Sequence, residues 1–183
     1  IYPAVKASTK VAPDIIHTTL PRFASRSPIG VDVVFESVGR LYIKRGDAAP
    51  ELLTEDESDG HEYAPVWAPN GEEVFFARWT DSQLGEIRSV SSKGGQSNPI
   101  LSTPAHYVDL SINSEGDELL FRRLGGSSLT SPDWGQKPGI YRFNLQSEAL
   151  EFVSKRGRSP HFGPKSRIYV TDRANTAVGR GSD

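Results

Sequence analysis

The sequence predicts an all-β protein: a partial β-propeller of about 3.5 to 4 four-stranded antiparallel blades. One hairpin pattern recurs along the chain at intervals of roughly 41 to 50 residues, and two more strand-like runs follow each complete copy. No segment keeps an apolar period near 3.6 residues, so almost no helix is expected. Four short strands in a repeat of this length are typical of propeller blades.

The clearest copy of the hairpin pattern is residues 64–78, Ala-Pro-Val-Trp-Ala-Pro-Asn-Gly-Glu-Glu-Val-Phe-Phe-Ala-Arg. An apolar stretch, a Pro/Asn/Gly turn and an aromatic run follow one another, as in a β-hairpin. A shift of 45 residues places Gly71 on Gly116, and a shift of 41 back places it on Gly30. The last copy, at 159–170, is one residue shorter. Adjacent antiparallel strands are therefore predicted at 64–68 with 73–78, and at 109–113 with 117–122.

The repeats divide the single domain, residues 1–183, into blades. The predicted blades are 22–55, 62–103 and 107–155, with a half blade at 159–173, possible outer strands at 1–21 and a polar tail at 174–183. Two architectures are open. Either the N-terminal strands complete the fourth blade and close a small ring, or the chain is an open arc cut from a larger propeller, as its stop in mid-blade favours. An open arc leaves strand edges unpaired, which allows self-association through the blade edges.

Three segments resemble known propellers. Residues 65–76, Pro-Val-Trp-Ala-Pro-Asn-Gly-Glu-Glu-Val-Phe-Phe, resemble the repeat of TolB-like (WD-repeat-like) propellers, roughly P-x-W-S-P-D-G-x-x-I-x-F. Residues 90–95 look like the turn before that family's outermost strand. Residues 125–141 are similar to a segment of the N-terminal propellers in some bacterial amidohydrolase-associated proteins. The resemblance spans 22–173 and implies a periplasmic or secreted protein, although Ser114-Glu115 replaces the Pro-Asp pair and the last copy lacks the turn glycine.

Composition narrows the functional classes. The 21 Lys+Arg and 23 Asp+Glu give a net charge of −2, which argues against nucleic-acid binding. No apolar run approaches the ~20 residues that span a membrane. The chain has no cysteine, which excludes catalysis by a thiol and zinc sites with thiolate ligands. Nucleophile-elbow, P-loop, H-E-x-x-H and His-x-His motifs are also missing. We therefore expect no catalysis by this chain itself and no cofactor.

Strand alternation places the connection into the first strand of a blade and the loop between its second and third strands at one end. Two such loops, at 79–85 and 124–138, are predicted to be longer than a tight turn, and long ordered loops often carry function. The entry residues of three successive blades lie at the same end. The predicted binding face comprises His61, His106, Arg156, Trp79, Asp81, Asp133 and Trp134.

Three histidines are candidate metal ligands. Neutral imidazole suits zinc, copper or iron, and the residues that could hold such an ion are His61, His106 and His161. No Asp/Glu/His set at ligand spacing accompanies them, so no metal site is expected.

Three functions follow. The first is a non-catalytic propeller that binds a protein or ligand, or frames access to a hydrolase domain absent from this chain. The resemblance to amidohydrolase-associated propellers implies that the parent protein would be a metal-dependent amidohydrolase. The partner of the propeller would be another protein or that missing domain. The second, which resemblance to oligogalacturonate lyases implies, is a lyase or hydrolase acting on acidic saccharides through a His/metal site. The third is a TolB-type periplasmic module that binds an extended segment of another protein.

Overall fold

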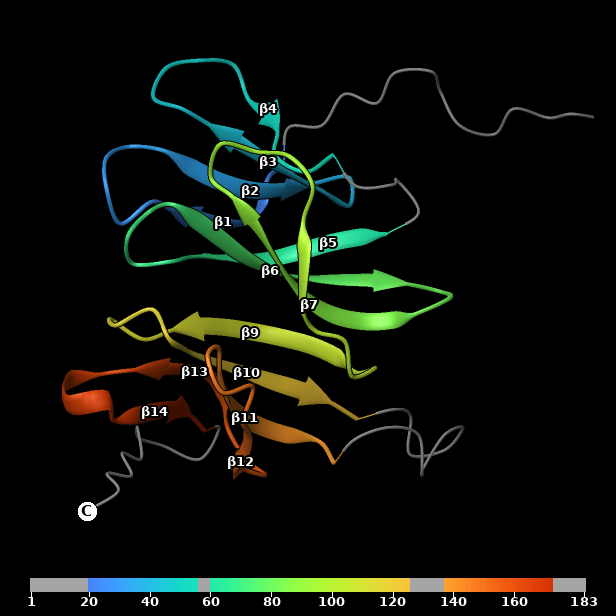
Figure 1. Cartoon of the computed structure of the whole chain (residues 1–183), viewed down its shortest axis with the longest axis vertical. Coiled ribbons are helices and arrows are strands. Elements are labelled where there is room, and N and C mark those ends of the chain that lie inside the picture. Colours follow the sequence, from blue (N-terminus) through green and yellow to red (C-terminus); the bar gives the residue numbers. More distant parts are fainter. Residues whose placement is uncertain (1–19, 56–59, 126–136, 173–183) are drawn as a thin grey trace, which may run out of the picture.

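A computed structural model describes residues 20–55, 60–125 and 137–172, and these residues form four antiparallel sheets (Figure 1). Three sheets have four strands, the fourth has two, and strands adjacent in sequence pair within each sheet. The predicted all-β partial propeller is confirmed. Within the described ranges, no helix is long and apolar enough to cross a membrane.

Each sheet is one blade. The first blade contains β1 (Arg22–Arg26), β2 (Val33–Ser37), β3 (Arg40–Lys44) and β4 (Glu51–Leu52). The second contains β5 (His61–Trp67), β6 (Glu73–Thr80), β7 (Leu84–Ser91) and β8 (Asn98–Leu101). The third contains β9 (His106–Ile112), β10 (Glu118–Leu124), β11 (Gly139–Asn144) and β12 (Leu150–Ser154). The fourth has β13 (Arg158–Phe162) and β14 (Ile168–Thr171), joined through the 3₁₀ turn Pro164–Ser166. The predicted hairpins are confirmed, since β5 pairs with β6 and β9 with β10.

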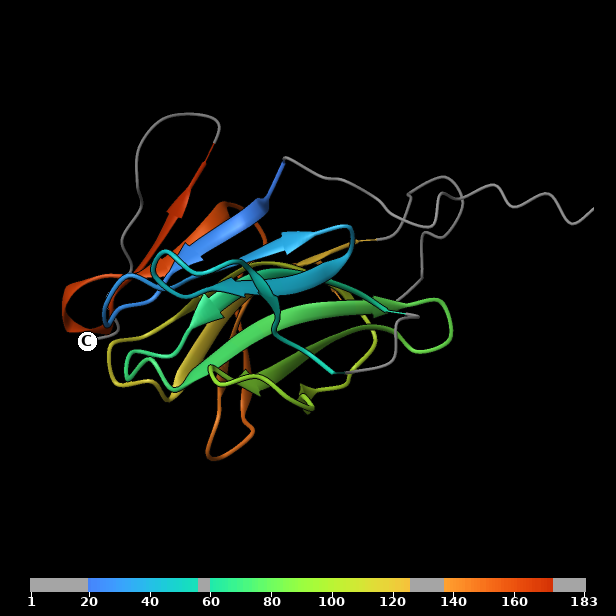
Figure 2. The ribbon, with the colours of Figure 1, turned by 90° about the horizontal axis from the view of Figure 1, so that it is seen from above.

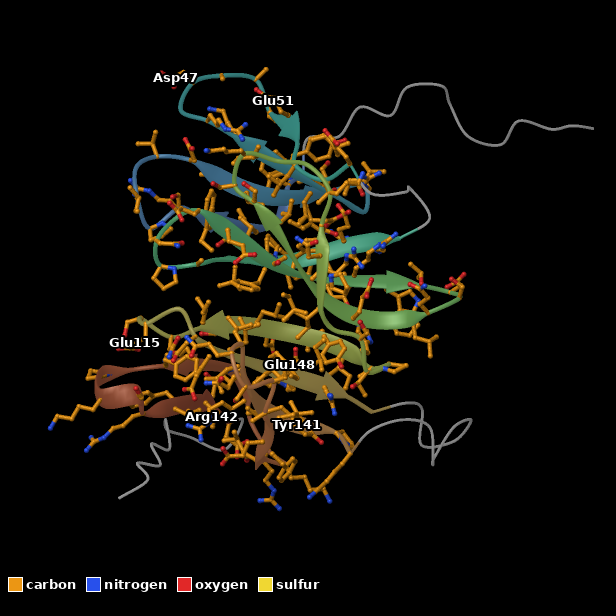
Figure 3. The ribbon with its side chains drawn as sticks, in the orientation of Figure 1. Asp47, Glu51, Glu115, Tyr141, Arg142 and Glu148 are labelled. Carbon is orange, nitrogen blue, oxygen red and sulfur yellow. The ribbon has the colours of Figure 1, made fainter. Side chains whose placement is uncertain are left out.

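The blades pack face to face in chain order. In Figure 1 the first blade lies at the top and the fourth at the lower left, beside the third, and Figure 2 shows the same blades from above. Neighbouring side chains on a strand point to opposite faces. Phe76 of β6 accordingly joins Val34 of the first blade in one buried cluster, and Phe75 joins Phe121 of the third blade in another. Burying such rings contributes about 1.5–3 kcal/mol each. Acidic residues such as Asp47, Glu115 and Glu148 stay exposed at the turns (Figure 3).

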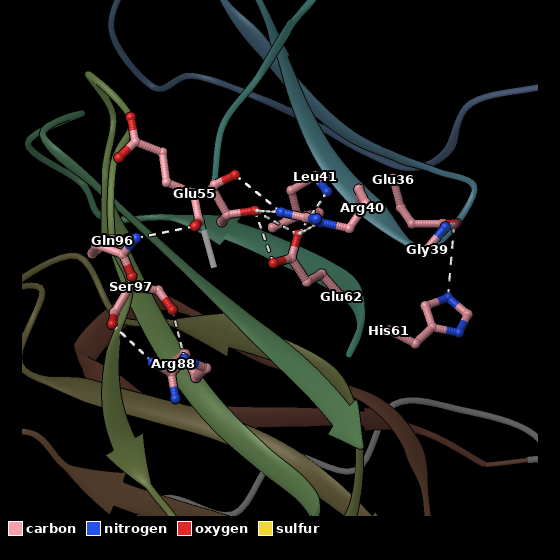
Figure 4. A network of polar contacts seen from close by, with 11 residues as sticks. Glu36, Gly39, Arg40, Leu41, Glu55, His61, Glu62, Arg88, Gln96 and Ser97 are labelled. Atoms are coloured by element: carbon pink, nitrogen blue, oxygen red, sulfur yellow. Dashed lines mark hydrogen bonds and ion pairs between the residues drawn. The ribbon is translucent and has the colours of Figure 1, made fainter. Parts of the chain in front are cut away.

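A buried carboxylate joins the first two blades. Glu62 of β5 is 1% exposed and reaches back to the first blade (Figure 4). Its oxygens accept hydrogen bonds from the Leu41 N–H at 2.9 Å and the Thr54 hydroxyl at 2.7 Å, and the Arg40 Nε lies 3.4 Å away. A buried charge is tolerated only with such partners, so this contact fixes the position of β5 against the first blade.

Every innermost strand carries a β-bulge at the same place. Phe23, Ala64, Asp109 and Ser159 have φ of 52°, 52°, 56° and 46°, and the pairing register shifts beside each one. A left-handed conformation in a residue other than glycine costs roughly 1–2 kcal/mol. The bulges bend the innermost strands just inside the entry end of each blade, where the candidate site lies.

The prediction of a longer loop at 79–85 is wrong. The pairing of β6 with β7 continues through Trp79 and Thr80, which face Gly85 and Leu84. Only Asp81–Gln83 connect the strands. The Thr80 hydroxyl accepts a hydrogen bond from the Gln83 N–H at 3.0 Å, which closes a tight turn and lets the ladder extend. Trp79 is therefore held on a strand.

Candidate functional site

Six side chains from three blades line a cavity of about 330 Å³ at the entry end of the blades. We call it the mouth pocket; its lining is Arg22 and Phe23 of β1, His61 and Tyr63 of β5, Trp79 of β6, and His106 of β9. His61 and Trp79 are cross-strand partners, so the hairpin places both rings together. The other rings arrive from the adjacent blades.

Tyr63 lies at the centre of the aromatic wall. Its ring centroid is 6.3 Å from Phe23, 5.6 Å from His61 and 6.2 Å from His106, the two histidines meeting it edge to face. Trp79 lies 5.7 Å from His106 on the far side. Aromatic pairs at such separations stabilise by about 0.5–1.5 kcal/mol each beyond burial. The wall is therefore held together by its own contacts as well as by the strands.

The polar side of the pocket is built on Glu36. This side chain is 1% exposed; its Oε2 accepts a hydrogen bond from the Arg22 Nε at 2.6 Å, and its Oε1 accepts one from the Gly39 N–H at 2.7 Å. His61 Nε2 lies 3.7 Å from Oε1 (Figure 4). Burial alone would raise the pKa of Glu36, but the bonds from Arg22 and Gly39 outweigh it and the pKa lies below its usual value.

The imidazole of His106 is uncharged at neutral pH. Burial, and secondarily the Arg122 guanidinium, lower the pKa of His106 below its ordinary value near 6.5. Arg22, whose side chain is 58% exposed, carries the positive charge at the rim. The mouth pocket thus offers aromatic faces, a neutral imidazole and one accessible guanidinium, which suits binding of an apolar group beside a carbonyl or carboxylate.

A second cavity of about 420 Å³ adjoins the mouth pocket, since Phe23 and Tyr63 line both. It runs along the bulges of three innermost strands and includes an ion pair between the Asp109 Oδ2 and the Arg122 Nε at 2.8 Å. The same Asp109 oxygen accepts a hydrogen bond from the Ser159 N–H of the fourth blade at 3.3 Å. The mouth pocket is therefore flanked by a second cavity lined by the innermost strands of three blades.

Of the seven residues of the predicted binding face, the structure brings His61, Trp79 and His106 together. Asp81 lies beside them, its Oδ1 accepting a hydrogen bond from the Trp79 indole at 3.4 Å. Arg156 borders a separate cavity of about 310 Å³ between the third and fourth blades. Asp133 and Trp134 lie outside the described residues.

The third histidine considered for a metal, His161, lies on the fourth blade. Its ring stacks on Tyr169 and lines another cavity, away from the mouth pocket. In the part of the chain that the structure describes, no group of three or more His, Cys, Asp or Glu side chains is placed to hold a metal ion.

Sequence reasoning missed Arg22, Phe23, Tyr63 and Glu36. The repeat held the signal for two of them, Tyr63 and Arg22. Tyr63 follows His61 by two positions and immediately precedes the bulge, and Arg22 occupies the corresponding position of the first blade. Glu36 is found only through its pairing with Arg22 across two strands.

No model of a known protein family and no curated protein sequence matches the chain. Several solved structures match the chain in fold. A putative TolB from Agrobacterium tumefaciens superposes with a TM-score of 0.68 at 18% identity, covering 86% of this chain and 56% of that one. TolB from Acinetobacter baumannii gives 0.64 at 13% identity, with 85% and 39% covered. Oligogalacturonate lyase from Vibrio parahaemolyticus gives 0.60 at 13% identity, with 77% and 42% covered.

The sheet order and these likenesses define the class of protein as a β-propeller, of which the described residues form part. Within that class the fold is of the TolB-like type. The chain spans 56% and 39% of the lengths of the two TolB structures. At these identities the likeness concerns the fold.

Proposed function

We propose that this chain is a non-catalytic binding module whose mouth pocket holds an extended segment of a protein partner. The observation that carries the proposal is the convergence of aromatic, imidazole and guanidinium groups from three blades on one cavity. Function in propellers lies in the site and not in the fold. Tight clustering of Trp, Tyr and Arg is characteristic of the anchoring points of protein interfaces.

Exposed apolar side chains around the pocket support a macromolecular partner. Phe23 is 51% exposed, and Leu20 and Val38 beside it are 78% and 57% exposed. Leu20 and Val38 line a hollow that shares Arg22 and His61 with the mouth pocket. A rim of this kind extends the contact beyond a small ligand, because a peptide covers both hollows at once.

The partner is a separate protein or a catalytic domain of the same polypeptide; in the second case the blades frame access to that domain, as the resemblance to amidohydrolase-associated propellers implies. The likeness to the TolB structures supports a protein partner in general. We propose a periplasmic or secreted location on the same resemblance. Fractionation of cells expressing the native gene tests that location.

The binding proposal is tested with a displayed library of random peptides. Peptides selected on the wild-type chain are measured by isothermal titration against wild type, Trp79→Ala and Phe23→Ala. We expect affinities in the micromolar range, and losses of roughly 10-fold or more in both variants, because each removes an aromatic anchor.

Val31→Ala is the matched control, since Val31 is also exposed (62%) but lies in the loop between β1 and β2. It should bind as wild type does. Selected peptides that bind all four proteins equally, or a selection that yields no binder, would contradict the proposal.

A further inference from the structure

Arg122 of β10 is a charged residue that lies beside the mouth pocket but does not line it. It lines the second cavity, the hollow of about 420 Å³ that shares Phe23 and Tyr63 with the mouth pocket. Among the described residues of that lining, it carries the only positive charge and Asp109 the only negative one. Burial first, and the charge of Arg122 second, lower the pKa of His106 in the mouth pocket. The guanidinium is therefore close to both cavities.

A β-bulge fixes the direction of this arginine. Asp109 has a φ of 56°, and the register of β9 with β10 shifts beside it; bulges of this kind re-aim side chains. The Asp109 Oδ2 accepts hydrogen bonds from the Arg122 Nε at 2.8 Å and from the Ser159 N–H at 3.3 Å. The residues at the other three bulges, Phe23, Ala64 and Ser159, carry no charge. Of the four described blades, only the third thus holds an arginine in this way.

The two terminal amino groups of Arg122 have no protein acceptor among the described residues, and neither is a buried atom without a partner, so both are accessible. Two other arginines are buried to a similar degree, Arg88 and Arg40, with side chains 13% and 18% exposed against 21% for Arg122. The Arg88 Nη2 donates to the Ser97 carbonyl at 2.8 Å. The Arg40 Nη2 donates to the Thr54 carbonyl at 3.0 Å. Arg122 instead keeps its Nη donors directed at no protein group.

The accessible edge of Arg122 suits a carboxylate. A guanidinium bound through Nε still presents Nη1 and Nη2, whose parallel N–H groups match the two oxygens of a carboxylate. Asp109 already offsets the charge of Arg122, so these directed hydrogen bonds hold a ligand more than net charge does. A phosphate dianion would meet a stronger repulsion from Asp109 than a carboxylate meets. The site therefore favours a ligand group with a single negative charge.

We propose that Arg122 binds a carboxylate of the partner segment whose apolar side chain occupies the mouth pocket. This inference rests on the proposed function and names the chemistry of the bound segment. One extended segment can occupy both cavities, because Phe23 and Tyr63 belong to both. Its carboxylate is the C-terminus of the segment or an Asp or Glu side chain within it.

Short synthetic peptides test the proposal on the whole chain by nuclear magnetic resonance, with the shifts of the Trp79 indole and the Arg122 Nε–H as reporters. The probes are acetylated Phe followed by zero, one or two Gly, each as the free acid and as the amide. A second series ends in Glu-amide or Gln-amide, which separates a side-chain carboxylate from a C-terminal one. At probe concentrations up to about 10 mM, at least one acid should bind about 10-fold more tightly than its neutral counterpart.

Three variants locate the carboxylate. Arg122→Gln should bind acid and neutral probes equally. Asp109→Asn should bind the acids as tightly as wild type or a few-fold more tightly, because it keeps an acceptor for the Arg122 Nε and removes the opposing charge. Arg142→Gln is the control, since Arg142 pairs with Glu118 and Glu151 and lines neither cavity. It should keep the preference for the acid.

Acids and neutral probes that bind wild type equally, or no binding by any probe, overturn the proposal. So does a preference that disappears in Arg22→Gln but not in Arg122→Gln, because the carboxylate would then lie at the rim. If Arg122→Gln does not fold, the wild-type Nε–H decides: an acid must move its shift and the matching amide must not. Tighter binding of digalacturonate than of every peptide would assign the carboxylate to a saccharide and overturn the peptide. The proposed function would survive a failure of this inference if library peptides still lose affinity in Trp79→Ala.

Discussion

Tyr63 and His106 meet edge to face across the boundary between the second and third blades, with ring centroids 6.2 Å apart at 85°. Tyr63 thus packs two blades together and lines the mouth pocket at the same time. Its side chain is buried, and within the described residues its hydroxyl has no hydrogen-bond partner. Burial, and secondarily Tyr107, raise the pKa of Tyr63 well above its usual value, so the group stays neutral.

The ring and the hydroxyl of Tyr63 should therefore have opposite effects on stability. Tyr63→Phe should leave the free energy of unfolding unchanged or raise it by up to about 1 kcal/mol, because it removes an unsatisfied buried group. Tyr63→Ala should lower it by roughly 3–5 kcal/mol, since it empties a packed site. Urea denaturation of both variants measures the difference. A Tyr63→Phe chain as unstable as Tyr63→Ala would mean that the hydroxyl has a partner.

Glu62 should be far more important to stability than an exposed acid. Glu62→Ala removes the carboxylate that accepts hydrogen bonds from two buried donors, the Leu41 N–H and the Thr54 hydroxyl. We expect the free energy of unfolding to fall by about 3 kcal/mol. Glu51→Ala is the control: its carboxylate is 66% exposed and pairs with Arg45 at the surface, so the loss should stay below about 1 kcal/mol. Equal losses would contradict a structural role of the buried carboxylate.

Glu36 should make stability depend on acid pH. The folded-state pKa of Glu36 is lowered, so its stabilisation is complete above the unfolded pKa near 4.3. It is lost as pH falls through the lower folded pKa. Wild type should therefore be more stable than Glu36→Gln at pH 7, and the difference should shrink in strong acid. Denaturation series between about pH 2 and 7 measure it; a gap that stays constant across this range would rule out Glu36 as its source.

Gly85 should tolerate no side chain. A Cβ at this position would lie 1.8 Å from the Ala105 carbonyl oxygen and 2.9 Å from its carbon, and backbone cannot move aside as a flexible side chain does. Gly85→Ala should lower the free energy of unfolding by more than about 2 kcal/mol. Ser82→Ala, in the adjacent exposed turn, should change it by less than about 0.5 kcal/mol. Thermal unfolding of the two variants decides; a stable Gly85→Ala chain would falsify this close approach.

The blades could be predicted from the sequence because each blade forms from residues that are close together in the chain. The hairpin of β5 and β6 follows from alternating apolar residues around Pro69-Asn70-Gly71, and its repetition fifty residues or fewer along the chain predicts the next. The equivalence of His61 and His106 came from the same repeat. The length of the 79–85 loop could not be predicted, because it depends on how far the β6–β7 ladder continues. The ladder extends to Thr80, whose hydroxyl accepts the hydrogen bond from the Gln83 N–H that closes the turn.

What the sequence determined by itself was therefore the all-β class, the four-strand unit and the end of the blades at which entry residues gather. These depend on contacts between residues close in the chain, where turn chemistry and side-chain alternation suffice. Only the tertiary structure decided which side chains meet: Arg22 with Glu36, and Tyr63 with both Phe23 and His106. Those contacts depend on the angle between packed blades and on the bulge in each innermost strand. Both result from burying whole faces at once, which no single stretch of sequence encodes.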